Sequence, residues 1–535
     1  MFHENLLLII SLLFAVSMLV MLGQKLKISY PIFLVIGGLL ISFIPGIPLI
    51  QMDPDMILTL FLPPLLYEAA WYTSWREFWK WKRPITLLAF GLVFFTSTVI
   101  AYLTNSMIPG FTLGLGFLLG GIISPPDAVA ATSVLKGVKI PKRLVTILEG
   151  ESLINDAASL IVFRVALVAV LSGEFSLGKT VTDFFVVGSM GIVVGLAVAH
   201  ILYVIHRFFP TTSNIDTALT LMSPYVMYIM AEHFHFSGVM AVVSGGLFLS
   251  YRSHELLSFS SRIQTVNVWA TIIFILNGIV FILIGLELPT IIHGLDNSSL
   301  EQGIQYGLII SAVTIAIRFI WVYPNAHLPR FMSKKIRESE PSPGWKSPLI
   351  VSWAGMRGVV SLAAALSIPL TLDGQAFPQR NLILLITFIV ILVTLVVQGL
   401  TLPLIIKLIK IEEIDDLVPE EEQAAHIKLR LMKASVAHID RYFQTEIDEN
   451  ELVLNLRKRL ANSVDLTSER LESLECQTME FEEVHVYNRV YLDLINIQRQ
   501  ELNKIRKEKV FELEVIQKQQ MELDFDESKF SQTSH

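Results

Sequence analysis

Two carboxylates and an amide lie inside a long apolar stretch of the chain. Glu151, Asn155 and Asp156 belong to the string Gly-Glu-Ser-Leu-Ile-Asn-Asp, within an apolar run over residues 145–171. The run is long enough to cross a bilayer, where ionisable groups face protein or a water-filled cavity. In a helix, Ser152 and Asp156 share one face at i and i+4, so a carboxylate and a hydroxyl can bind a small hard cation or a proton. The alternative is a helix-packing motif with one satisfied aspartate.

Two more acids follow proline pairs in apolar runs. Glu68 lies about one turn after Pro63-Pro64, and Asp127 directly follows Pro125-Pro126. Prolines remove backbone donors, so the first pair is predicted to kink or open its helix and the second to interrupt it. The interruption would free backbone carbonyls for a cation and place Asp127 near the N-terminus of a half-helix.

The elements that must position these residues are apolar spans, which predict an all-α polytopic membrane protein. Thirteen lie at about residues 5–22, 28–50, 55–72, 84–104, 111–135, 145–171, 184–206, 216–234, 236–251, 266–290, 304–324, 347–370 and 381–408. Alternate connections carry 20 basic residues on one side and 2 on the other. By the positive-inside rule, the N-terminus is expected outside and the C-terminal tail in the cytosol.

Spans 5 and 12 are both interrupted. Span 12 contains Trp353-Ala354-Gly355-Met356-Arg357-Gly358, a glycine-broken stretch with a charge. The two spans are seven apart in order, so they run in opposite directions. This arrangement predicts inverted repeats with two broken helices that cross at the midplane, although two unrelated kinks would give the same sequence pattern.

Charge separates the chain into two parts. Residues 1–410 hold 25 basic and 20 acidic residues, and residues 411–535 hold 16 and 28. We therefore expect a transmembrane domain over 1–410 and an acidic helical cytoplasmic tail over 411–535, with a regulatory role or a dimer contact. The polar end of the tail, residues 522–535, is predicted to be disordered. No motif indicates a cofactor, nucleic-acid binding or an enzyme, and Cys476 is the only cysteine, so no intrachain disulfide can form.

Four stretches, residues 62–69, 124–130, 150–158 and 355–358, resemble the cation/proton antiporter-1 family, the sodium–proton exchangers of NhaP and NHE type. The resemblance covers about residues 1–410. It implies a thirteen-span inverted-repeat fold, a homodimer, and exchange of Na⁺ or Li⁺, and sometimes K⁺, for H⁺.

The resemblance also assigns expected roles to single residues. The family's cation carboxylate corresponds to Asp156, its neighbouring asparagine to Asn155 and its ligand serine to Ser152. The acids of the two proline-bearing spans correspond to Glu68 and Asp127. Asp156, Ser152 and Glu68 are thus the expected ligands of Na⁺.

Two further assignments depend on details of this chain. Many family members have threonine where this chain has Pro126, so a ligand at that point must be the Pro126 backbone carbonyl. The family's buried Glu–Arg pair implies that Glu151 binds Arg318 or, as the alternative, Arg357.

The sequence thus predicts a secondary-active monovalent cation/proton antiporter of the plasma membrane that serves pH and cation homeostasis. Asp156 would bind either a proton or a cation. Asn155 does not titrate, which predicts electroneutral one-for-one exchange. The alternatives are a monovalent cation channel, an intramembrane enzyme and an ion sensor that acts through the tail. A channel would need a continuous pore with filter loops, and an enzyme would need a nucleophile with a base.

Overall fold

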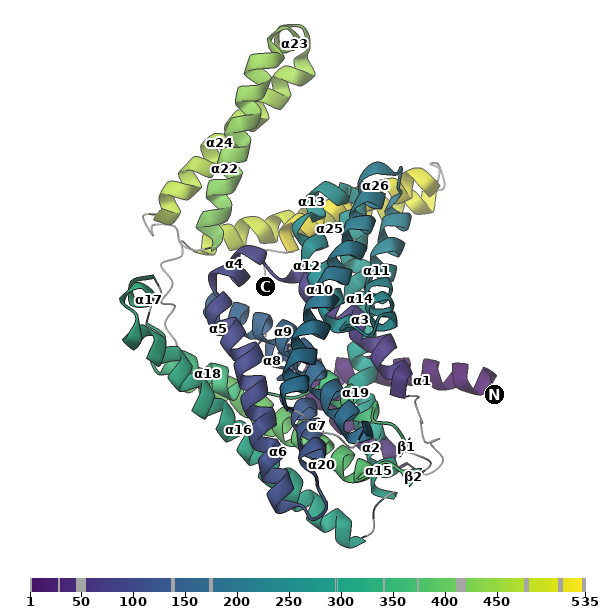
Figure 1. Cartoon of the computed structure of the whole chain (residues 1–535). Coiled ribbons are helices and arrows are strands. Elements are labelled where there is room, and N and C mark those ends of the chain that lie inside the picture. The colour runs from purple at the N-terminus through teal and green to yellow at the C-terminus, as the bar shows by residue number, and fades with distance from the viewer. Residues whose placement is uncertain are drawn as a thin grey trace. The chain divides into compact units, whose positions relative to one another are not determined.

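The computed structural model describes residues 2–26, 29–44, 54–135, 140–172, 177–293, 295, 297–339, 342–372, 375–409, 420–475, 481–508 and 513–531. The chain divides into two compact units, Met1–Asp415 and Asp416–His535 (Figure 1). The division falls close to the domain boundary that the change in charge predicts.

The first unit is a bundle of helices with one short β-ribbon, in which β1 (Thr371–Leu372) pairs antiparallel with β2 (Gln375–Ala376). Within the described ranges, six helices of 25 to 33 residues are long and apolar enough to cross a membrane, and shorter apolar helices lie among them. The helical elements are α1 (Phe2–Leu26), α2 (Tyr30–Ser42), α3 (Pro54–Tyr72), α4 (Trp75–Lys80), α5 (Lys82–Thr86), the π-helical turn η1 (Leu87–Leu92), α6 (Val93–Met107), α7 (Leu113–Ile123), α8 (Ala128–Leu135), α9 (Lys142–Ser172), α10 (Leu177–Phe208), α11 (Ser213–His233), α12 (Gly238–Tyr251), α13 (Ser253–Leu256), α14 (Phe259–Leu286), α15 (Leu288–His293), α16 (Asn297–Met332), α17 (Lys334–Ser339), α18 (Lys346–Trp353), α19 (Val359–Leu366), α20 (Arg380–Val393), the π-helical turn η2 (Thr394–Gln398) and α21 (Gly399–Ile409).

One helix in the interior of this unit, α20, is buried on every side. Residues 382–391 of α20 are all buried, and α20 packs against α16, α19 and α7. Large apolar side chains are exposed on outer helices, among them Phe14, Ile201 and Leu404. A water-soluble bundle would bury such side chains, whereas helices that face lipid need not.

Two helices are interrupted, as the sequence predicts. The residues between α7 and α8 include Pro125-Pro126, and those between α18 and α19 include Gly355 and Arg357. The carboxylate of Asp127 and the start of α19 are in hydrogen-bond contact, so the two interruptions meet in space.

The sequence predicts that Pro63-Pro64 kinks or opens its helix. The helix does not open, so that part of the prediction is wrong. α3 continues from Pro54 to Tyr72 with both prolines inside it. Pro64 cannot donate to the carbonyl of Leu60, but the Tyr225 hydroxyl donates to that oxygen at 3.1 Å. A side chain from α11 therefore satisfies one acceptor that proline leaves open, which allows the helix to continue.

The second unit consists of α22 (Glu420–Tyr442), α23 (Gln444–Glu449), α24 (Glu451–Glu475), α25 (Phe481–Glu508) and α26 (Leu513–Ser531). α22 packs against α24 through a small core of Ala425, Leu429 and Leu471 (Figure 1). Arg457 donates to Asp440 at 2.6 Å across the same hairpin, and these hydrogen bonds lower the pKa of Asp440.

The prediction of disorder at the end of the tail is wrong over residues 522–531. α26 is helical to Ser531, while residues 532–535 and Cys476 lie outside the described residues. α25 packs against α26, and Arg499 forms ion pairs with Asp524, at 2.5 Å, and Glu527. The prediction of disorder came from polar composition, which does not show that Arg499 pairs with acids of the next helix.

Candidate functional site

A cavity of about 370 Å³, with carboxylates and hydroxyls in its wall, lies inside the apolar bundle. Its wall includes residues of α2, α3, α8, α9, α14 and α19 and of the break between α7 and α8. Asp156, Glu68, Asp127, Ser152 and Pro126 all line it. The structure therefore brings together five of the six residues for which the sequence predicts ion contacts; Asn155 is not among the lining residues.

Asp156 lies in the middle of α9, the helix that carries most of the motif. Its side chain is 8% exposed, and Ser152, one turn earlier, is 9% exposed and lines the same cavity. The helical spacing of four residues places both groups on one face. Ser159, a further turn along, is also buried, but its hydroxyl donates to the backbone carbonyl of Asp156 at 2.9 Å.

Asp127 joins the two interrupted helices. Its Oδ1 accepts from the backbone N–H groups of Val129, at 2.8 Å, and Ala130, at 3.2 Å, at the start of α8. Its Oδ2 accepts from the N–H of Val359 at 3.3 Å, at the start of α19. One carboxylate thus caps two helix N-termini, where the helix dipole favours negative charge.

Gly358 makes this approach possible. A side-chain Cβ at this position would collide with the carboxylate of Asp127. The backbone N–H of Asp127 in turn donates to the carbonyl of Met356 at 2.7 Å, so the two breaks are also joined through main-chain atoms. Gly358, at the break between α18 and α19, is therefore required by Asp127, at the break between α7 and α8.

Arg357 supplies the opposite charge at the same crossing. Its guanidinium donates to the carbonyl of Ile123, the last residue of α7, at 3.0 Å, and to the carbonyl of Gly355, two residues after the end of α18. Its backbone N–H donates to Thr394 Oγ1 at 3.1 Å, and its side chain is 1% exposed. A cation at helix C-termini complements the dipoles in the same way as Asp127 does at the N-termini.

Glu151 forms its ion pair with Arg318, and Arg357 has the separate role just described. Two parallel hydrogen bonds of 2.6 and 2.8 Å join the guanidinium of Arg318 to the two carboxylate oxygens. Both side chains are 1% exposed. Arg318 Nε also donates to the Val351 carbonyl at 2.9 Å, so this pair connects α9, α16 and α18 beside the crossing. Bidentate geometry of this kind is the strongest form of an Arg–carboxylate contact.

Asn155 is completely buried, and neither polar atom of its amide has a hydrogen-bond partner among the residues that the structure describes. The sequence places Asn155 at the ion site only through the family resemblance, and the lining of the cavity does not include it. Pro126 is buried and lines the cavity. The cost of the uncompensated amide is of the order of 1–3 kcal/mol.

The further polar residues of the cavity wall include Tyr30, Asn277 and Ser361. Asn277 is 3% exposed and Ser361 1%; neither Asn277 Oδ1 nor Ser361 Oγ has a partner within the described part of the chain. Sequence reasoning missed all three because each is a single polar residue without a motif. The one available signal was an asparagine in the middle of an apolar span, where polar side chains face the protein interior.

The cavity reaches the protein surface at one end. Glu149 and Tyr72, which lie near the start of α9 and the end of α3, line it there and are exposed. Asp156 is about 10 Å farther along α9, since seven residues of helix separate it from Glu149. The deep end of the cavity is therefore at Asp156 and its mouth lies toward the Lys142 end of α9.

An ion pair between α9 and α11 lies on the other side of Asp156 from the mouth of the cavity. Arg164, two turns farther along α9, forms an ion pair with Glu232 near the end of α11 and donates to the Phe236 carbonyl at 3.3 Å. Glu232 also accepts from the backbone N–H of Gly238 at 3.1 Å. A small void of about 50 Å³ lies here, and Leu62 lines both this void and the larger cavity.

Comparison with known proteins gives one consistent family. Residues 9–408 match the transmembrane sodium/hydrogen exchanger family. An uncharacterized Na⁺/H⁺ exchanger of Mycobacterium tuberculosis is 30% identical over 98% of this chain and 96% of its own length. A sodium, potassium, lithium and rubidium/H⁺ antiporter of Bacillus subtilis is 34% identical over 71% of this chain and 58% of its length.

The fold is similar to that of a solved antiporter structure. The sodium proton antiporter MjNhaP1 of Methanocaldococcus jannaschii aligns with a TM-score of 0.59 over 74% of this chain and 99% of its own, at 20% sequence identity. At that identity the likeness concerns the arrangement of helices alone.

Proposed function

The chain belongs to the sodium/hydrogen exchanger family, and we propose that it exchanges a monovalent cation for protons at the cavity that contains Asp156. The observation that carries the proposal is the buried Asp156 carboxylate at the deep end of a cavity that opens at one side of an apolar bundle. A carboxylate in such a place can bind a proton or a cation and release it to water.

Competition for Asp156 would couple the two fluxes. A protonated carboxylate is neutral and loses its attraction for Na⁺, while a bound cation excludes the proton. Ser152 and Glu68 supply further oxygens from the same wall, and the Pro126 carbonyl is the fourth proposed ligand. Oxygen donors of this kind suit a small hard cation.

Access from the second side requires the Arg164–Glu232 contact to open. In the present structure the cavity has its mouth toward Glu149, and the ion pair lies beyond Asp156 on the other side. We propose that α9 moves together with the two interrupted helices relative to α11 and α12, so that Arg164 separates from Glu232 as the mouth near Glu149 closes. Such rocking of one helix group against another is the usual route of alternating access, and it agrees with a thirteen-span inverted-repeat fold.

One-for-one, electroneutral exchange follows from the partners of the other acids. Asp127 accepts three backbone hydrogen bonds at helix N-termini, and Glu151 forms its pair with Arg318. In both cases hydrogen-bond donors already engage the carboxylate. Asn155 cannot titrate, and Glu68 of the same cavity is proposed as a cation ligand, so we assign the alternation between a proton and a cation to Asp156.

The setting of the transporter is proposed on broader grounds. The protein is a multi-pass membrane protein, and the excess of basic residues at the Lys142 end assigns that end to the cytosol. We place it in the plasma membrane as a homodimer, as the family resemblance implies, with the acidic unit after residue 410 as a cytoplasmic regulatory or dimer-contact domain. A transporter role, rather than catalysis, agrees with the family.

Exchange can be measured in proteoliposomes loaded with a pH-sensitive dye. Adding Li⁺, Na⁺, K⁺ or Rb⁺ outside acid-loaded vesicles should drive proton efflux for each cation that is a substrate. Proton efflux without a cation gradient would indicate a proton leak. Cation flux without proton movement would indicate a channel, and either result would contradict exchange. Ser152→Ala should raise the KM for the cation. The matched control is Ser159→Ala, one turn beyond Asp156, whose hydroxyl bonds to the backbone, and its KM should be unchanged.

A further inference from the structure

A second cavity, separate from the ion site, lies among five helical elements of the first unit. Its volume is about 80 Å³, several times the space that one water needs. Residues of α5, η1, α9, α16 and α18 line it. These elements include α9, which carries Asp156, and α16, which carries Arg318, so a ligand here would contact the helices that hold the ion site.

Three arginines converge on this cavity. Arg83, Arg143 and Arg330 all line it, and the described residues contribute no acidic side chain to the lining. Each arginine lies near the end of a membrane-spanning helix, within Lys82–Met107, Lys142–Ser172 and Leu300–Met332. A guanidinium has five N–H donors in a fork that matches phosphate, so an existing contact does not exhaust it.

Trp81 provides an independent indication of a ligand. It lines the cavity and is 4% exposed, and its indole Nε1–H has no acceptor among the described residues. The Arg143 guanidinium lies over its ring at 5.1 Å from the centroid, which fixes the two groups against each other. Indole N–H is a donor only, so an acceptor-rich ligand would satisfy it.

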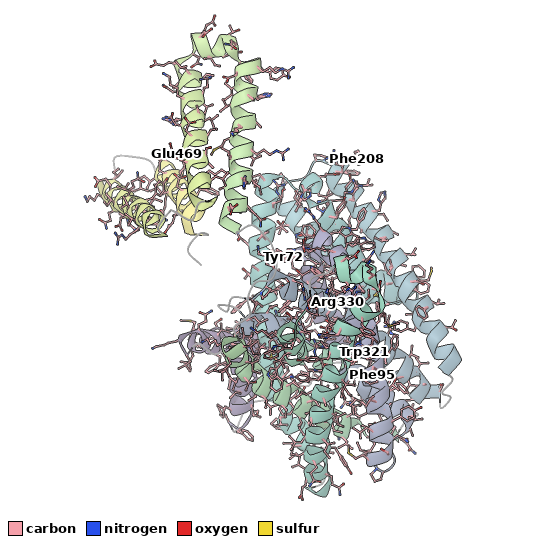
Figure 2. All side chains as sticks on the ribbon, turned by 90° about the vertical axis from the view of Figure 1, so that its left-hand side faces the viewer. Tyr72, Phe95, Phe208, Trp321, Arg330 and Glu469 are labelled. Atoms are coloured by element: carbon pink, nitrogen blue, oxygen red, sulfur yellow. The ribbon has the colours of Figure 1, made fainter. Side chains whose placement is uncertain are left out.

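The remainder of the wall is apolar. Leu88, Ile147, Val322 and Val351 are buried and face the same space. Figure 2 shows Arg330 and Trp321 along α16, with Phe95 of α6 beside Trp321; the two rings stack at 5.1 Å. Arginine donors at the helix ends, next to an apolar wall, match a molecule with an anionic head group and hydrocarbon chains.

We propose that this cavity binds the phosphate group of an anionic phospholipid. Arg83, Arg143, Arg330 and the Trp81 N–H would donate to the phosphate oxygens, and the glycerol backbone would lie against the apolar wall. Basic pockets between membrane helices recognise anionic lipids through these interactions. Binding at this position would hold α5, α9, α16 and α18 together, and it does not depend on which ion is exchanged.

The test compares lipids that differ in charge alone. Purified full-length protein in neutral detergent is melted with phosphatidylglycerol or with phosphatidylcholine of the same acyl chains, and native mass spectrometry counts the lipids retained. We expect phosphatidylglycerol to raise Tm more than phosphatidylcholine and to remain bound. Arg330→Gln and Arg143→Gln should each lose at least half of that difference. Trp81→Phe, which keeps an aromatic ring but removes the indole N–H, should lose part of it.

The control is Arg76→Gln, which removes an exposed arginine of α4 that does not line the cavity. It should keep the full effect; an equal loss in this variant would attribute the effect to general surface charge and overturn the proposal. Inorganic phosphate is the second arm, and if it reproduced the whole effect the ligand would be a soluble anion and not a lipid. Arg330 is half-exposed, so Arg330→Gln is the variant expected to fold even if the others do not. Unchanged lipid retention in Arg330→Gln would refute the site.

Discussion

Breaking the Glu151–Arg318 pair should lower stability more than any other single change at the site. The substitution Glu151→Gln keeps the shape of the side chain but removes its charge. Arg318 would then remain buried, with its side chain 1% exposed, a full positive charge and no carboxylate partner. Loss of one partner of a buried, bidentate pair costs about 3–5 kcal/mol, mostly because the other charge is left uncompensated.

The expected change in melting temperature follows from the size of the unit. Unfolding entropy grows with chain length, so each kcal/mol lowers Tm by roughly 1–2 °C in a unit of this size. Glu151→Gln should therefore melt roughly 3–10 °C below wild type in detergent, followed by tryptophan fluorescence, and Arg318→Met should show a similar loss.

A double variant separates the pair from its surroundings. Glu151→Leu with Arg318→Met leaves no unpaired charge, so it should be more stable than either single variant, although the Val351 carbonyl still loses its donor. Glu232→Gln is the control, because the side chains of the Arg164–Glu232 pair are 39% and 27% exposed and its loss should cost less than about 1 kcal/mol. A Glu151→Gln protein that melts like wild type would refute the structural role of the pair.

Further predictions concern transport. Arg164→Gln and Glu232→Gln should leave Tm nearly unchanged but alter the exchange rate, because the closed state on that side loses its ion pair; an unaltered rate would exclude the contact from gating. Exchange of Na⁺ for H⁺ should be insensitive to a membrane potential set with K⁺ and valinomycin, whereas Asn277→Asp adds a titratable group to the cavity wall and should make exchange voltage-dependent. A reversal point that follows voltage in the wild type would show that a second acid titrates, with Glu68 the first candidate. Removing residues from Glu420 onward should preserve exchange in liposomes but shift its pH dependence or maximal rate; complete loss of transport in a folded truncation would contradict a regulatory tail.

The parts of the fold that follow from composition could be predicted in outline: the described residues contain six helices long and apolar enough to cross a membrane, while the count of thirteen spans stays a prediction. Apolar spans, the change in net charge near residue 410 and the interruption at Pro125-Pro126 are all properties of local sequence. The continuation of α3 through Pro63-Pro64 was not predictable in this way, because it depends on a hydroxyl from Tyr225, 161 residues after Pro64 in the chain.

In the site, too, features that depend on local sequence could be predicted and features that depend on tertiary packing could not. Spacing in one helix is sufficient to place Ser152 and Asp156 on one face. The partner of Glu151 is different, because Arg318 and Arg357 are both buried cations in later spans and tertiary packing decides between them. The two hydrogen bonds from Arg318 and the helix-capping contacts of Arg357 assign the two arginines to separate partners. Asn277 and Ser361 required the structure, since a single polar residue in an apolar span does not indicate which cavity it lines.

The central claim is that a cation and a proton compete for Asp156. The most direct measurement is a titration of purified protein with Na⁺ in weakly buffered detergent, in which calorimetry reports the cation bound and a pH-indicating dye reports the protons released. Wild type should release one proton for each cation that binds, and Asp156→Asn should neither bind the cation nor release a proton. Cation binding without proton release in the wild type, or release that persists in Asp156→Asn, would contradict the mechanism.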